Sequence, residues 1–153
     1  MGRIRVDFLN SKQRKQFFRQ LQETYGYSGS TEYAIYLGGD DKYYVVSSDI
    51  DKVDFVALGV RQGGLYVASK IRDELRLTMD GAMLFGPSCS GCFVEVNESE
   101  KNAWMRGEEL ETNIVEARYV LIKYKNKILG CGHAANNSIK PYISKGRRIS
   151  DPH

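Results

Sequence analysis

The sequence predicts an α+β fold, in which an N-terminal α/β part precedes a small β barrel. Apolar residues recur with helical spacing between Asn10 and Gly26, whereas most later apolar segments alternate with polar residues and are separated by glycine-containing turns. The second half combines many short strand-like segments with few helical ones, which favours a small barrel over a doubly wound sheet. With 153 residues, of which 42% are hydrophobic, the chain has enough apolar side chains for a packed interior.

The first predicted element is an amphipathic helix. Asn10 and Gln13 have the spacing of a capping box, in which each side chain bonds the other residue's backbone N–H. Phe17, Leu21 and Tyr25 then recur on one helical face until glycine follows at position 26. We therefore expect the helix to end at Tyr25.

Hairpins follow in the first half. The motif GGDD at 38–41 and the sequence QGG at 62–64 each separate two segments rich in Tyr, Ile, Val and Leu, as in hairpins with glycine-dependent turns. The predicted strands of this half are 32–37, 42–47, 54–60, 65–68 and 75–79. Asp80 is expected to cap a short helix that runs to Phe85 and ends at Gly86-Pro87.

The second half begins with a predicted strand at 93–96. Asn97 or Ser99 is expected to cap a helix that holds Trp104, and Gly107 has the place of a left-handed residue at its end. Further strands are expected at 119–124 and 128–132, and a last one around Tyr142 and Ile143 after Pro141.

The basic residues are unevenly placed. The net charge is only +3, yet residues 118–149 contain no Asp or Glu. The basic side chains of this stretch are Arg118, Lys123, Lys125, Lys127, Lys140, Lys145, Arg147 and Arg148. A concentrated basic run beside a nearly neutral remainder indicates a polyanionic partner, although a solvated basic surface would have the same pattern.

Several motifs of the second half resemble a known RNA-binding module. They are 106–110 (RGEEL), 119–124 (YVLIKY), 129–132 (LGCG), 139–142 (IKPY) and 145–149 (KGRRI). In order and spacing they resemble the PUA-like domain at the C-terminus of the Sun/Fmu family of RNA cytosine-5 methyltransferases. The first half, through 43–47 (YYVVS) and Leu58-Gly59, resembles the pre-PUA domain of small ribosome-biogenesis factors. The resemblance implies a pre-PUA-like α/β domain over residues 1–88 and a PUA-like pseudobarrel over 89–153.

The resemblance also implies binding to structured RNA, either rRNA or tRNA, in ribosome biogenesis or RNA modification. Basic side chains neutralise phosphates, and aromatic rings stack on bases. The predicted RNA-binding residues are Arg118, Lys140, Tyr142, Lys145, Arg147 and Arg148. Lys145, Arg147 and Arg148 match the basic tail motif of the family. Tyr124 alternates with Lys123 and Lys125, so we expect it to face the core instead.

Catalysis has little support in the sequence. The chain lacks a G-x-G-x-x-G loop after a strand and the Pro-Cys pair of the methyltransferase domain, so we expect a non-catalytic protein without a cofactor. An RNA-modifying enzyme or a pre-ribosomal protein is the expected protein partner. The rival hypothesis is a protein-interaction adaptor that retains the PUA-like module as a scaffold, with the basic run around an exposed apolar patch.

A zinc site is the remaining alternative. Cys89, Cys92, Cys131 and His133 are four possible ligands, and C-x-x-C is a common half of a structural site. Cys131 lies within a Gly-x-Gly pattern where the family has a core residue, so buried free thiols are the preferred reading. No apolar segment of membrane-spanning length occurs and no apolar signal segment follows Met1, and we expect a cytoplasmic protein without membrane contact.

Overall fold

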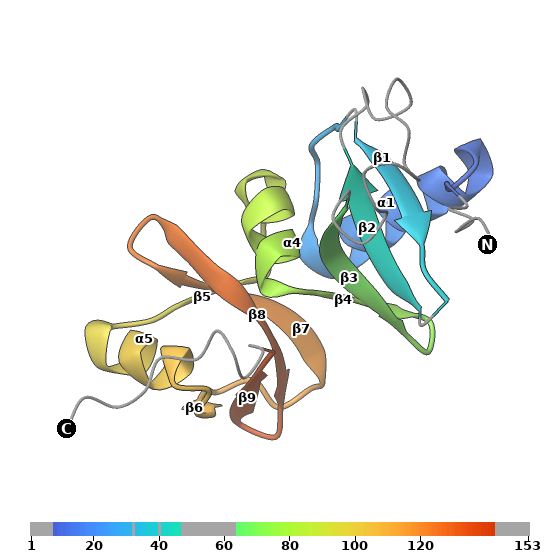
Figure 1. Cartoon of the computed structure of the whole chain (residues 1–153). Helices are drawn as coiled ribbons and strands as arrows, with labels where there is room; N and C mark the ends of the chain where they lie inside the picture. The colour runs from blue at the N-terminus through green and yellow to red at the C-terminus, as the bar shows by residue number, and fades with distance from the viewer. Residues whose placement is uncertain (1–7, 32, 40, 47–63, 143–153) are drawn as a thin grey trace.

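The computed structural model describes residues 8–31, 33–39, 41–46 and 64–142 and has the predicted α+β fold (Figure 1). The first half comprises α1 (Ser11–Tyr25), β1 (Ala34–Leu37), β2 (Lys42–Val46), β3 (Leu65–Ile71), β4 (Glu74–Leu77), α4 (Met79–Phe85) and the 3-10 helix η2 (Gly86–Ser88). The second half comprises β5 (Phe93–Glu95), α5 (Glu98–Met105), β6 (Leu110–Glu111), β7 (Arg118–Tyr124), β8 (Lys127–Ala135) and β9 (Ser138–Pro141). No helix in these ranges is long and apolar enough to cross a membrane.

Helix α1 has the predicted ends. The Asn10 side chain accepts a hydrogen bond from the backbone N–H of Gln13, and the Gln13 side chain accepts one from the N–H of Asn10. At the other end Gly26 has φ 68°, the left-handed conformation that glycine adopts with little strain. Phe17, Leu21 and Tyr25 are buried and hold the helix against the first core.

The first sheet has the strand order β1-β2-β3-β4 with antiparallel neighbours (Figure 1). The GGDD hairpin between β1 and β2 is confirmed, and the predicted segments 65–68 and 75–77 lie in β3 and β4. The predicted strand at 54–60 and residue 47 lie outside the described residues.

Two sequence predictions about α4 need correction. Thr78, and not Asp80, caps α4: its side chain accepts a hydrogen bond from Gly81 N–H and donates one to the Tyr66 carbonyl. Met79 therefore begins the helix instead of ending the strand, and Asp80 lies in the first helical turn, where a carboxylate suits the helix dipole. The α-helix ends at Phe85 with Gly86 as its C-cap, as predicted, and Gly86–Ser88 then form the 3-10 helix η2.

The end of the described chain also differs from the prediction. The last described strand is 138–141 and Pro141 is its final residue, whereas we expected the strand to follow the proline. Pro141 is tolerated because β6 pairs only with Ser138 and Ile139, so its missing N–H faces no partner strand on that side. Strand β6 was not predicted, and Ile143 lies outside the described residues.

The second sheet has the order β5-β7-β8-β9-β6 and curls into a half barrel (Figure 1). Asn97 caps α5 with Glu100 in a capping box, and Gly107 has φ 86°, as predicted. Trp104 of α5 is fully buried against Val120, Ile122, Ala134 and Ile139 of the curled sheet. A Cβ on Gly132 would lie 2.7 Å from the Trp104 ring and from the Ile139 side chain, so the close approach of β8 to α5 requires glycine there.

Strand β7 belongs to two cores at once. Val120 and Ile122 face the core around Trp104, whereas Tyr119 and Leu121 face the core that contains α1 and the first sheet. Consecutive side chains of a strand point to opposite faces, so β7 contributes to both cores and joins the two halves of the chain. Cys131 of β8 packs in the same shared core as Tyr119.

Candidate nucleic-acid interface

Three of the six predicted RNA-binding residues lie in or next to strands β7 and β9 of the second sheet. Arg118 begins β7 and is exposed, Lys140 is exposed on β9, and Tyr142 follows β9 and is half-buried. Lys145, Arg147 and Arg148 lie outside the described residues.

Tyr142 is surrounded by aromatic and basic side chains. The guanidinium of Arg76 on β4 lies 4.2 Å from the ring centroid of Tyr142, close enough for a cation–π interaction. The ring of Tyr119 lies 6.3 Å from that of Tyr142 and 5.1 Å from that of His133. His133 pairs with Lys140 across β8 and β9. We name Arg76, Tyr119, His133, Lys140 and Tyr142 the aromatic-basic cluster.

The cluster combines residues from both halves of the chain. Arg76 comes from the first sheet, opposite in alternation to the buried Leu75 and Leu77, and the other members come from the second sheet. One face of the Tyr142 ring is therefore occupied by Arg76, and the guanidinium plane itself offers a surface on which a base can stack.

Charge at the cluster is positive at neutral pH through Arg76 and Lys140. Burial, followed by the proximity of Tyr142, raises the pKa of Tyr119 to about 12, so its hydroxyl remains a neutral hydrogen-bond donor. Glu74 on β4 is a nearby acid that acts in the same direction on the pKa of Tyr119. Tyr119 is thus a neutral, buried member of the cluster that lies beside Tyr142 and His133.

Arg118 lines a neighbouring hollow instead of the cluster. This hollow of about 340 Å³ is formed by Glu23 and Thr24 of α1, Glu74 of β4, Cys92 and Tyr119, among others. The structure therefore relates Lys140 to Tyr142 through His133 and Tyr119, and places Arg118 in the neighbouring hollow, which Tyr119 also lines.

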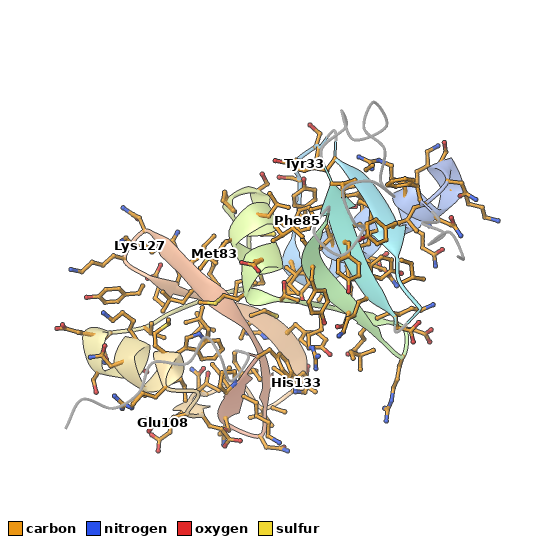
Figure 2. The ribbon with its side chains drawn as sticks, in the orientation of Figure 1. Tyr33, Met83, Phe85, Glu108, Lys127 and His133 are labelled. Atoms are coloured by element: carbon orange, nitrogen blue, oxygen red, sulfur yellow. The ribbon has the colours of Figure 1, made fainter. Side chains whose placement is uncertain are left out.

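The remaining lysines of the basic run lie elsewhere. Lys127 begins β8 and His133 lies near its other end, and Figure 2 shows the two labels at opposite ends of this strand. The Nζ atoms of Lys101 and Lys125 lie 4.9 Å and 5.3 Å from the ring centroid of Tyr124. Tyr124 is half-buried and packs against the core around Trp104. Tyr124 thus contacts the core, as predicted, and its ring also lies close to two lysine side chains.

The four candidate zinc ligands are placed for other contacts. The Cys131 sulfur lies 3.5 Å from the Tyr25 hydroxyl, and the thiols of Cys89 and Cys92 donate to the carbonyls of Phe85 and Tyr25. Burial raises the pKa of Cys131 to about 12, which disfavours the thiolate that binds zinc. Among the described residues, no three His, Cys, Asp or Glu side chains lie together as a metal site.

Cys89 and Cys92 influence each other. The interaction with Cys92, followed by burial, raises the pKa of Cys89, whereas the interaction with Cys89 lowers the pKa of Cys92 against the effect of burial. Both residues are buried free cysteines that pack in the first core.

Comparison with known families identifies the second half. Residues 93–149 match the family described as Methyltransferase RsmF PUA domain. The C-terminal half of the chain is a PUA-like domain. The match spans the curled sheet from β5 onward, α5, the core around Trp104 and the candidate residues Arg118, Lys140 and Tyr142. A PUA domain suggests RNA binding. The comparison with curated proteins found no match to this chain.

The match confirms the predicted PUA-like half. It begins at Phe93, so the resemblance of residues 1–88 to a pre-PUA domain and the predicted boundary after residue 88 stay predictions. Sequence reasoning missed that Arg76 and His133 belong to the aromatic-basic cluster. The burial of Leu75 and Leu77 on either side of Arg76 was the available signal that Arg76 points away from the first core. The contact between Arg76 and Tyr142 joins segments far apart in the sequence, so no local pattern predicts it.

Proposed function

We propose that this protein binds structured RNA through its PUA-like domain and acts as a non-catalytic RNA-docking protein. The observation that carries the proposal is the match of residues 93–149 to the PUA domain of a methyltransferase family. The aromatic-basic cluster supports it, because it combines the two kinds of side chain that RNA recognition needs.

In the proposed mechanism Lys140 and Arg118 neutralise phosphates. Both side chains are exposed, so their interaction with phosphate requires little desolvation. Arg76 and Tyr142 offer a stacking surface to an unpaired base. Lys145, Arg147 and Arg148 add phosphate contacts in this proposal on the strength of the sequence motif alone.

We further propose that the RNA is a cytoplasmic rRNA or tRNA. The protein would act in ribosome biogenesis, or as the RNA-docking subunit of a modification enzyme or pre-ribosomal partner. The support is the description of the matched family, in which the PUA domain accompanies a methyltransferase. Any chemistry would be supplied by the partner.

Salt-dependent binding tests the proposal. Affinity of the full chain for unfractionated tRNA and for rRNA should fall as KCl rises. Lys140→Gln with Arg118→Gln should reduce the slope of log K against log[KCl] by about 1.4 to 1.8, because each neutralised phosphate contributes about 0.7 to 0.9. Lys125→Gln with Lys127→Gln is the matched control, since it removes the same charge from the β7–β8 turn.

Two results would contradict this function. Binding that is absent or independent of salt would exclude phosphate anchoring. Capture of a protein partner from a nuclease-treated lysate, together with no affinity for either RNA, would favour the adaptor hypothesis. An adaptor would use exposed apolar side chains for its partner. Among the described residues, the exposed large hydrophobic side chains are Phe8, Tyr33, Leu65, Ile71, Met83 and Val115.

A further inference from the structure

Helix α1 has a basic face opposite its buried face. Lys12, Lys15 and Arg19 are exposed. At 3.6 residues per turn their directions fall within a sector of about 60°, roughly opposite the buried Leu21, and they span about 10 Å along the helix axis. The packing of α1 therefore does not explain these three side chains.

The three basic side chains have no internal role in the described structure. Arg14 offers a contrast, because its guanidinium donates hydrogen bonds to the carbonyls of Thr31 and Tyr33 at 2.6 Å and lies over the Phe18 ring. Within the described residues, Lys12, Lys15 and Arg19 form no ion pair, side-chain hydrogen bond or ring contact.

The position of these charges also opposes helix stability. The first turn of α1 contains no acidic residue, and Lys12 lies in that turn, at the end at which the helix dipole is positive. Cations at that end are disfavoured. A basic face that costs the helix stability and supports no packing indicates a ligand of opposite charge.

Shallow grooves flank the ridge formed by Lys15 and Arg19. One groove, of about 670 Å³, is lined further by Phe18, Gln22 and Tyr27, and none of the described residues that line it is acidic. The other groove, of about 640 Å³, lies along Lys12, Gln16 and Gln20 and has Glu23 at the C-terminal end of the helix. Side-chain amides beside cations can donate hydrogen bonds to phosphate and sugar oxygens.

We propose that the basic face of α1, with Lys12, Lys15 and Arg19, is a second phosphate-binding surface that contacts the backbone of the RNA held by the PUA-like domain. The proposal rests on the proposed function of the second half. The helix lies behind the first sheet, away from β9 (Figure 1), and β9 carries Lys140, so the two surfaces would engage separate parts of one folded RNA. Structured RNA is favoured over an acidic protein because the chain already has an RNA-binding type of module and because the grooves supply uncharged amides that suit a phosphodiester backbone.

The test compares two charge-matched variants of the full chain. Lys15→Gln with Arg19→Gln should reduce the salt slope of binding to unfractionated tRNA by about 1.4 to 1.8. Lys70→Gln with Arg72→Gln removes the same charge from exposed positions at the turn between β3 and β4 and should leave the slope unchanged. Both variants should melt at or above the wild-type temperature, since all four side chains are exposed.

The outcomes separate this proposal from the proposed function. One outcome overturns the α1 surface and leaves the PUA-like site standing. In it, Lys140→Gln with Arg118→Gln lowers the salt slope of tRNA binding below that of the wild type, whereas the two charge-matched variants have slopes equal to each other. If the wild type binds no RNA, both are overturned. If Lys15→Gln with Arg19→Gln abolishes binding to poly-glutamate and leaves tRNA binding intact, the face belongs to an acidic protein and the proposal fails.

Discussion

Replacement of Gly26 by alanine should strongly destabilise the fold, because this glycine joins the end of α1 to the start of the second half. A Cβ at position 26 would overlap the carbonyl oxygen of Ser90, and Gly26 also has φ 68°. The surrounding backbone is firmly connected: Ser28 N–H donates to the Ser88 carbonyl at 2.8 Å and Ser90 N–H donates to the Tyr25 carbonyl at 3.3 Å. Relief of the overlap therefore requires movement of backbone that carries hydrogen bonds.

The expected loss is the sum of two effects. The left-handed conformation costs a residue with a side chain about 1 to 2 kcal/mol, and relief of an overlap in a packed region costs about 1 to 3 kcal/mol. The sum of about 2 to 5 kcal/mol is a large part of the 5 to 15 kcal/mol that is typical of a domain.

Gly91→Ala is the control that separates these effects. Gly91 has φ 82° but no heavy atom within 4 Å of an added Cβ, so only the conformational cost of about 1 to 2 kcal/mol applies. Urea unfolding of the wild type and both variants measures the difference in the free energy of unfolding. Equal losses in the two variants would refute the packing of Gly26 against Ser90.

Other predictions address the cores and the cluster. The free energy of unfolding should fall as pH rises above about 9. Folding raises the pKa of Cys131 to about 12 and so favours the protonated thiol, whereas the unfolded chain loses this proton at lower pH. The contribution of Cys131 to the free energy of unfolding should therefore decrease by about 2 kcal/mol between pH 7 and pH 10.5. Cys131→Ala should flatten this part of the stability curve, and an equally steep curve would contradict the assignment. Gly132→Ala should lower the melting temperature through contact with Trp104 and Ile139, at a cost of about 1 to 3 kcal/mol, and an unchanged melting temperature would be inconsistent with the close approach. Tyr142→Ala should weaken RNA binding by about 1 to 3 kcal/mol without a change in salt slope, whereas Tyr142→Phe should bind like the wild type, and equal binding by all three would exclude stacking.

Much of the fold could be predicted because the signals are local. The capping box of Asn10 and Gln13, the spacing of Phe17, Leu21 and Tyr25, and Gly26 together specify α1. The same holds for the GGDD hairpin and for the cap of α5.

Errors arose where tertiary contacts decide. The cap of α4 is Thr78 because its hydroxyl also bonds the Tyr66 carbonyl of a neighbouring strand, which the local sequence does not reveal. Strand β6 has only two residues and exists through pairing with Ser138 and Ile139. A pattern of two residues carries no recognisable period.

The candidate site was predictable only in part. Lys140 and Tyr142 were identified because basic and aromatic residues are adjacent there and match a family motif. Arg76 and His133 join them through the packing of one sheet against the other and through strand register. Neither relation can be read from spacing along the chain.

Photo-crosslinking of the full chain to tRNA or rRNA, followed by mass spectrometry of the modified peptides, tests RNA binding by the PUA-like domain most directly. The structure predicts nucleotide adducts on the peptides that contain Lys140 and Tyr142, and their loss in Lys140→Gln with Tyr142→Ala. Efficient crosslinking with every adduct outside residues 93–149, or no RNA crosslink at all, would contradict the assignment of RNA binding to this domain.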